Sequence, residues 1–144
     1  MKIENGELKM KELTRETMNN VAEAHRYLDN AKDILREKAQ KEDGFYQDEK
    51  YVKMAGNTAY SGILVALDGL FGIKKKGRKS VDWYQEELGK VDKKILTSFN
   101  AAYKNLHLAM GYDGNPTVDV SNAGLKQAES IISWVETKQE EVRH

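Results

Sequence analysis

The sequence predicts an all-α fold, an up-down-up-down four-helix bundle. Apolar residues recur at intervals of three and four along most of its 144 residues, which is the period of an amphipathic helix. Pro116 is the only proline, and no segment shows clear strand alternation. Three connections between the predicted helices are short enough to join antiparallel neighbours, so this bundle is the simplest architecture.

The first predicted helix covers residues 15–41. Thr14 is a suitable N-cap, and Asp43-Gly44 is expected to stop the helix. The segment 1–13 is expected to be loosely ordered, and residues 14–144 to form a single domain. The apolar stripe of this helix consists of Val21, Ala24, Leu28, Ala31 and Leu35.

The second predicted helix covers residues 47–72 and carries two apolar stripes. The small stripe is Ala55, Ala59, Gly62, Ala66 and Gly69, and the large one is Tyr60, Leu64, Leu67 and Phe71. Two such faces indicate a helix that is covered from more than one side. We favour the interpretation that this helix is the most buried element of the bundle. The alternative is that part of this helix, or a surface of the last helix, forms a homodimer interface; that surface is Ile131, Trp134 and Val135.

The third predicted helix covers residues 80–111, with Ser80 as its N-cap and Gly89 as a possible bend. Its stripe consists of Leu88, Val91, Ile95, Phe99, Ala102, Leu106 and Met110. A loop rich in turn-forming residues follows. The last predicted helix covers residues 121–139 and carries Leu125, Ala128, Ile132, Val135 and Gln139.

Composition excludes several classes of function. The 23 basic and 23 acidic residues cancel, so no net charge attracts nucleic acid or an anionic membrane. The absence of cysteine excludes thiol catalysis and thiolate metal sites, and it fits a cytoplasmic protein. The N-terminal sequence does not resemble a signal peptide. The least charged stretch, 54–73, is too polar for a membrane span.

The histidines do not predict a catalytic or metal site. His107 lies near a predicted helix C-terminus, where a half-buried imidazole can interact with free carbonyl groups. The Glu-x-x-His spacing of carboxylate-bridged metal sites occurs once, from Glu141 to His144, whereas such a site needs it on two helices. His25 pairs in spacing with Asp29, as surface residues often do. We therefore expect no metal and no cofactor.

Asp68 is the only acidic residue in an apolar stretch of twenty. Aligning the predicted antiparallel helices places it near Asn19, Asn20 and Tyr84 at one end of the bundle. A small-molecule site would be indicated by a pocket lined by Asp68, Tyr84, Asn19 and Arg15. The alternative is a structural carboxylate with hydrogen-bond partners, and we favour that reading.

A basic loop precedes the third helix, with five positive charges at Lys74, Lys75, Lys76, Arg78 and Lys79. The free N–H groups of the helix that begins at Ser80 point back towards it, and this combination favours anions. A weak anion site at Lys76, Arg78, Lys79 and Ser80 is one hypothesis. A solvated loop is the more common outcome. Single-stranded nucleic acid is not expected, because no aromatic residue interleaves with the charges.

Three segments carry a resemblance to a known family: "AHRYLDNAKDIL", "GFYQDEKYVKMAGNTAYSGILVALDGLF" and "AAYKNLHLAMGYDG". They resemble an uncharacterised family of small bacterial helical proteins, a domain of unknown function, over roughly residues 20–135. The helix order also resembles the wider HEPN-type bundles. That class includes nucleotidyltransferase partner subunits and ribonuclease toxins.

The HEPN resemblance does not imply ribonuclease activity. The ribonucleases of that class carry an arginine separated by four to six residues from the catalytic histidine. Asn100, Ala101 and Ala102 occupy those positions before His107. None provides the cation that would stabilise a phosphorane-like transition state.

Two classes of function remain open. The first, which we favour, is a non-enzymatic interaction or accessory module, with a homodimer or an unidentified protein as its partner. The second is a protein that binds a nucleotide or another anionic small molecule, related to nucleotidyltransferase partner subunits.

Overall fold

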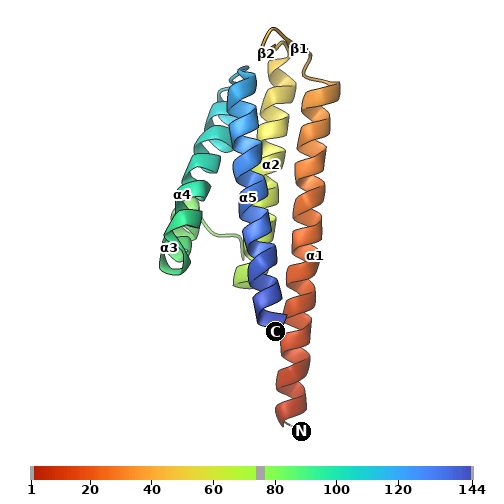
Figure 1. Cartoon of the computed structure of the whole chain (residues 1–144), viewed down its shortest axis with the longest axis vertical. Helices are drawn as coiled ribbons and strands as arrows, with labels where there is room; N and C mark the ends of the chain where they lie inside the picture. Colours follow the sequence, from red (N-terminus) through yellow and green to blue (C-terminus); the bar gives the residue numbers. More distant parts are fainter. Residues whose placement is uncertain (1, 74–76, 144) are drawn as a thin grey trace.

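Helices dominate the computed structural model of the chain, which describes residues 2–73 and 77–143 (Figure 1). Side chains are described at Arg15 and from Met18 to Glu141, outside the same gap. The predicted all-α class is confirmed. The bounds and continuity of the helices differ from the prediction in several places.

The first helix, α1, spans Lys2–Glu37, whereas the sequence predicted residues 15–41. Its predicted apolar stripe, from Val21 to Leu35, is buried against the bundle. Figure 1 shows the N-terminal part of α1 continuing beyond the ends of the other helices. The loose ordering expected for residues 1–13 stays a prediction.

A small hairpin replaces the predicted end of the first helix. Strands β1 (Lys41–Glu42) and β2 (Phe45–Tyr46) pair antiparallel, with Lys41 opposite Tyr46. Asp43 and Gly44 connect them with φ values of 51° and 84°. An Asp-Gly pair adopts two consecutive positive φ angles readily and is typical of a two-residue hairpin turn. The sequence prediction missed these strands because two residues are too few to show alternation.

The hairpin also joins the turn that precedes the last helix. The Tyr46 amide donates to the carbonyl of Pro116 at 2.8 Å, and the Val118 amide donates to that of Gly44 at 3.0 Å. Phe45 and Thr117 form an isolated antiparallel bridge. Two turns far apart in the sequence are therefore hydrogen-bonded at one end of the bundle.

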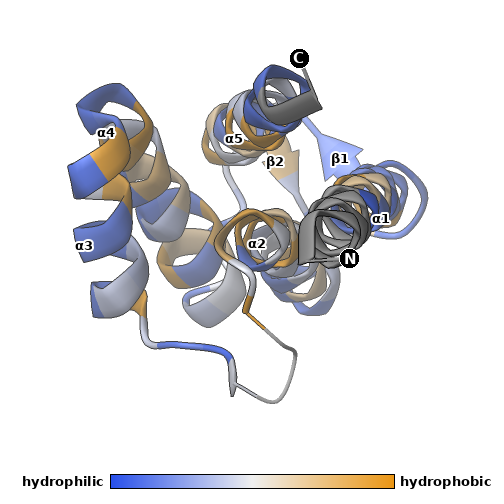
Figure 2. Cartoon of the chain, turned by 90° about the horizontal axis from the view of Figure 1, so that it is seen from below, coloured by the Kyte–Doolittle hydropathy of each residue, from blue (hydrophilic) through white to orange (hydrophobic). Residues whose placement is uncertain are grey.

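Helix α2 (Glu49–Phe71) is the central element. The Asp48 side chain caps its N-terminus, and Gly72 ends it in the left-handed conformation with a φ of 68°. The helix contacts α1, α5 (Val118–Arg143) and the π-helix η2 (Tyr103–Tyr112), and Figure 2 shows α1 and α5 on two sides of it. Most of both apolar stripes is buried, which confirms central burial.

The predicted interface on the last helix, α5 (Val118–Arg143), is wrong. Ile131 and Val135 are fully buried in the core, and Trp134 packs against it. These side chains point into the bundle because α5 contacts α1, α2 and α4 (Lys93–Ala102) at once. The helix also begins three residues before the predicted start at 121.

The third predicted helix is not continuous. It consists of α3 (Val81–Val91), α4 (Lys93–Ala102) and the π-helix η2 (Tyr103–Tyr112). Asp92 separates the first two with an extended backbone, φ −160° and ψ 112°, and its carboxylate accepts from the amides of Lys94 and Ile95. An aspartate that can cap a new helix allows the break there, which the Gly89 prediction misplaced.

The π-helix lies against α2 at a pair of glycines. A Cβ atom on Gly56 would lie 2.5 Å from the Leu106 carbonyl oxygen and 2.9 Å from the Gly111 nitrogen. The Asn57 side chain donates to the Gly111 carbonyl at 3.3 Å. The missing side chains let the two backbones approach closely. In Figure 1, α1 and the α4–η2 segment run in one direction, and α2 and α5 run in the other.

Candidate ligand pocket

Asp68 forms a structural cluster, as the favoured reading predicted. It is buried, it accepts a short hydrogen bond from the Tyr84 hydroxyl, and it accepts from Arg78 Nε at 3.1 Å. Burial raises the pKa of Tyr84 above its ordinary value, and the hydrogen bond to Asp68 raises it further. The phenol therefore stays protonated and donates to the carboxylate.

The other residues of that predicted pocket lie elsewhere. Arg15 and Asn19 are exposed, and neither has a described hydrogen bond or ion pair with Asp68. Asn20 contacts α2 instead, donating to the Val65 carbonyl at 3.0 Å. The helix alignment therefore placed the end of α2 correctly beside Asn20, whereas Arg15 and Asn19 lie on the exposed side of α1.

The predicted anion site is weakened by the same cluster. Arg78 pairs with the buried Asp68 carboxylate, so its charge is already balanced. The Ser80 hydroxyl accepts from the Trp83 amide as the N-cap of α3, as predicted. Lys79 is exposed, and Lys76 lies outside the described residues. Within the described part of this loop, Lys79 is the one basic side chain without an ion pair.

His107 is held by stacking. Its ring centroid lies 4.9 Å from that of Tyr60 and 5.3 Å from that of Tyr103, and the side chain is half-buried. His25 Nε2 lies 2.9 Å from the Glu136 carboxylate, at hydrogen-bond distance, rather than pairing with the predicted Asp29. Within the described residues, no group of three His, Asp or Glu side chains could hold a metal ion; His144 lies outside them.

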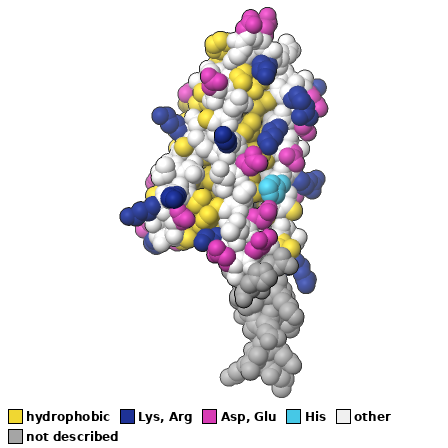
Figure 3. All heavy atoms as spheres, viewed as in Figure 1, with side chains coloured by type: hydrophobic (Ala, Val, Ile, Leu, Met, Phe, Trp, Pro, Cys, Tyr) yellow, Lys and Arg dark blue, Asp and Glu magenta, His cyan; other side chains and the backbone are white. Residues whose placement is uncertain are grey.

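A pocket of about 520 Å³ lies between α1, the hairpin and α5. Figure 3 shows apolar side chains exposed in a strip between α1 and α5, with Lys and Arg side chains around it. The pocket is lined by Lys32, Leu35, Arg36, Lys41, Tyr46, Asn122, Leu125, Lys126 and Glu129. This volume is in the range of small-molecule sites.

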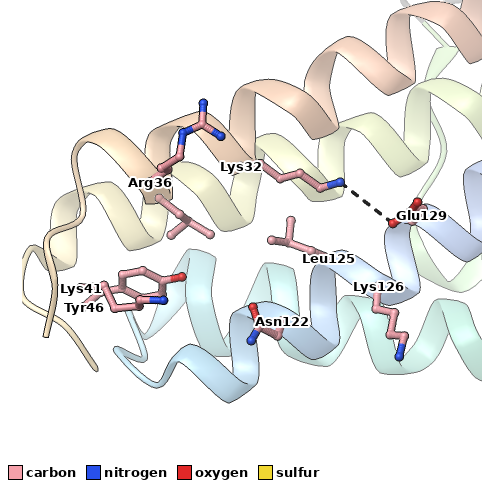
Figure 4. Close-up of a pocket in the computed structure, with 9 residues that line it drawn as sticks. Lys32, Arg36, Lys41, Tyr46, Asn122, Leu125, Lys126 and Glu129 are labelled. Atoms are coloured by element: carbon pink, nitrogen blue, oxygen red, sulfur yellow. Dashed lines mark ion pairs between the residues drawn. The ribbon is translucent and has the colours of Figure 1, made fainter. Parts of the chain in front are cut away.

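The floor of the pocket is apolar. Leu35 is 4% exposed and Leu125 is half-buried. Figure 4 shows Leu125 between α1 and α5, with the Tyr46 hydroxyl directed towards the same space. The pocket therefore offers contact area to an apolar group, with a single phenolic oxygen at its hairpin end.

The rim of the pocket is basic, with four Lys or Arg residues against the single acid Glu129. Lys32 Nζ lies 4.0 Å from the Glu129 carboxylate and closes one end (Figure 4). Arg36 is held on α1 by Asp33, at 2.5 Å, and by Glu37, at 3.7 Å. The other two basic residues of the rim, Lys41 and Lys126, have no ion pair with any described residue. An anion entering this pocket meets an excess of positive charge.

The hydroxyl of Tyr46 is oriented by a defined chain of hydrogen bonds. Ser121 Oγ donates to the Val118 carbonyl at 2.8 Å, which uses the only proton of the serine hydroxyl. Tyr46 Oη lies 3.2 Å from Ser121 Oγ, so the tyrosine is the donor in that bond. The lone pairs of the Tyr46 oxygen consequently remain as acceptors at the pocket.

A second pocket, of about 480 Å³, lies between α1 and α2. It is lined by Tyr27, Asn30, Asp33, Ile34, Glu37, Lys38, Met54 and Thr58. Its two acids, Asp33 and Glu37, both pair with Arg36, and Lys38 is the only basic residue in its lining. This pocket lacks the excess charge that distinguishes the first.

A family described as a domain of unknown function (DUF5618) matches residues 19–137. The chain belongs to that family. The match contains every residue of the pocket between α1 and α5, from Lys32 to Glu129. The first turns of α1 lie outside the matched range.

One solved structure is similar to this chain over most of its length. A protein of unknown function from Dyadobacter fermentans is 56% identical, and the similarity covers 85% of this chain and 97% of that chain with a TM-score of 0.79. No curated protein matches the sequence. These comparisons do not show a relationship to HEPN-type bundles. Within the described residues, no helix has the length and apolar character that crossing a membrane requires.

Sequence reasoning missed the pocket between α1 and α5. Lys32 and Arg36 are spaced by four residues beside the buried Leu35, and Asn122, Leu125 and Glu129 follow the same period. That pattern was available as a signal. The pattern predicts a pocket only if the first and last helices are known to be neighbours. Aligning each helix with the next one along the chain does not reveal that contact.

Proposed function

We propose that this DUF5618 protein is a binding module for a small organic anion, which occupies the pocket between α1 and α5. The observation that carries the proposal is the arrangement of four basic side chains and one acid around an apolar floor. The apolar floor contributes affinity through contact area, and the basic rim selects the sign of the charge. A cytoplasmic location, which the lack of cysteine supports, is part of this proposal.

Phenyl phosphate is a suitable probe because it combines a ring with an anionic group. Its titration at low salt should shift the amide resonances of Leu35, Tyr46 and Leu125. Salt should weaken the binding, because the contacts with the rim are exposed to solvent. Absence of any shift in these resonances would remove the proposal.

A matched pair of triple variants separates the pocket from general charge. Exchange of Lys32, Lys41 and Lys126 for glutamine should weaken binding by roughly tenfold, if each lysine contributes a few tenths to 1 kcal/mol. The control exchanges Lys93, Lys94 and Lys104, which are exposed and lie on α4 and η2. The control has the same net charge, so an equal loss of affinity in both variants would refute a defined site.

A second candidate is the interaction module with a homodimeric arrangement. Phe45 and Tyr112, 51% and 78% exposed, lie near the hairpin end of the bundle, where large exposed aromatic side chains favour contact with another protein. Light scattering at tens of micromolar tests it. We expect a dimer mass that the double change of Phe45 and Tyr112 to serine converts to a monomer. A monomer mass for the unchanged protein excludes this candidate.

A further inference from the structure

The pocket between α1 and α5 is not uniform from end to end, and this difference restricts its ligand. The helix end is closed by the pair Lys32–Glu129. The hairpin end contains Lys41 and Tyr46, which are directly opposite each other in the hairpin. Side chains of directly opposed residues lie on the same face of a two-stranded ribbon, within about 5.5 Å at their Cβ atoms. Figure 4 shows the two side chains next to each other.

Lys41 is the anchor for the negative charge. Arg36 is engaged by Asp33 and Glu37, and in Figure 4 its guanidinium points away from α5. Lys126 points away from the pocket in the same view. One cation without an ion pair therefore remains next to the apolar floor, which suits one anionic group rather than a polyphosphate chain.

Tyr46 requires the ligand to carry a hydrogen-bond donor. Its proton is directed to Ser121 Oγ, because that hydroxyl gives its own proton to the Val118 carbonyl. The Tyr46 oxygen can then only accept a hydrogen bond from a ligand. A carboxylate has no proton to offer at neutral pH, and a phosphate monoester is mostly the dianion, so this oxygen does not favour the anionic group itself.

The donor and the anionic group must lie close together on the ligand, since Lys41 and Tyr46 are neighbours. An ammonium donor beside Lys41 would be repelled by its like charge. A hydroxyl group is neutral and avoids this repulsion. The apolar floor formed by Leu35 and Leu125 requires a third feature, a ring or a branched alkyl group.

We infer that the ligand is a hydroxy acid with an apolar body: a carboxylate held by Lys41, an adjacent hydroxyl that donates to Tyr46, and a ring over Leu35 and Leu125. This inference rests on the proposed function and narrows its class of ligand. Neither the family description nor the related structure assigns a ligand of this kind.

Two probes that differ in one hydroxyl group test the inference. The probe 3-phenyllactate has the carboxylate, the hydroxyl and the ring, and 3-phenylpropionate lacks only the hydroxyl. We expect 3-phenyllactate to bind the full chain about fivefold more tightly, the effect of one hydrogen bond. Lactate, without the ring, should bind more weakly than either. Dissociation constants come from amide shifts at low salt.

Variants then assign each group to its partner. Tyr46→Phe should bring the affinities of the two ring probes together, and this ratio does not depend on a change in stability. Lys41→Gln should weaken both probes alike, whereas Lys104→Gln, the matched control, should leave both unchanged. Persistence of the fivefold ratio in Tyr46→Phe would overturn the assigned donor.

The remaining outcomes separate this inference from the proposed function. Equal binding of both ring probes to the unchanged protein overturns the hydroxy acid and leaves an anion site. If phenyl phosphate binds and neither carboxylate probe does, the hydroxy acid is likewise overturned and an anion site is left. Absence of binding by all three ring probes overturns the inference and the proposed function together.

Discussion

The Arg36 guanidinium lies 2.5 Å from the Asp33 carboxylate on the same helix, although Arg36 lines the pocket between α1 and α5. An anion in the pocket and Asp33 therefore compete for one cation. Both partners are substantially exposed, so the pair is weak. Its effect is nevertheless measurable as a change in ligand affinity.

Asp33→Asn should strengthen phenyl phosphate binding about twofold to threefold, because Arg36 becomes free to turn towards the pocket. Removal of any nearby negative charge produces part of this effect, and Asp29→Asn, one turn earlier in α1, measures that part. The gain should disappear when Arg36→Gln is added. A gain that persists in the double variant would show that Arg36 has no role.

Tyr84→Phe should lower the free energy of unfolding by about 1–3 kcal/mol, because the buried Asp68 carboxylate loses a donor. Arg78→Gln should cost less, since its side chain is partly exposed and its ion pair is screened. Chemical denaturation provides the measurement. Tyr27→Phe is the control at a half-buried tyrosine, and a loss as large there would count against the cluster.

Stability should fall at alkaline pH. Burial raises the pKa of Tyr84 and of Tyr60 above the ordinary value of 10.0. Well below pH 10 both phenols are protonated in the folded and unfolded chains, so their contribution to the free energy of unfolding is fully present. Above it, the unfolded chain releases protons that the folded chain retains, and stability is lost. Urea unfolding between pH 8 and 11 should show this decrease, and Tyr84→Phe should reduce its slope.

Gly56→Ala should destabilise the protein by about 1–3 kcal/mol, the usual cost of inserting a methyl group into a tightly packed contact. The new Cβ would meet the backbone of η2, which cannot turn away as a side chain can. Gly89→Ala is the matched change in α3, where the nearest atom is Leu96 Cδ2 at 3.4 Å. There we expect a neutral or stabilising effect from better helix propensity.

The sequence predicted the parts of the fold that depend on long apolar stripes. Leu28 and Leu35 are buried in α1 as expected, because a stripe sustained over several turns has one favourable orientation. Breaks set by single residues were less predictable. In the sequence, Asp92 fits equally well as a polar residue on the exposed face of a continuous helix. Only its neighbours in space favour its role as the N-cap of α4.

The candidate site was less accessible from the sequence than the fold. The prediction placed Asp68 and Tyr84 together correctly, because α2 and α3 follow each other in the chain. The pocket at Lys32 and Leu125 joins the first helix with the last, and no short connection aligns that pair. The anion site at the basic loop stays a prediction. The sequence did not reveal that Arg78 pairs with the buried Asp68, because the two residues lie ten positions apart on different elements.

The hydrogen bonds between the hairpin and the turn before α5 have a consequence for how the bundle opens. Gly44 and Tyr46 hold Val118 and Pro116 at one end, so α1, α2, η2 and α5 are tied together there. Partial unfolding should then begin at the opposite end, where the described residues form no backbone hydrogen bonds between two distant turns. The pocket between α1 and α5 lies beside the tied end, and the amides of its lining residues should be among the last to exchange with solvent.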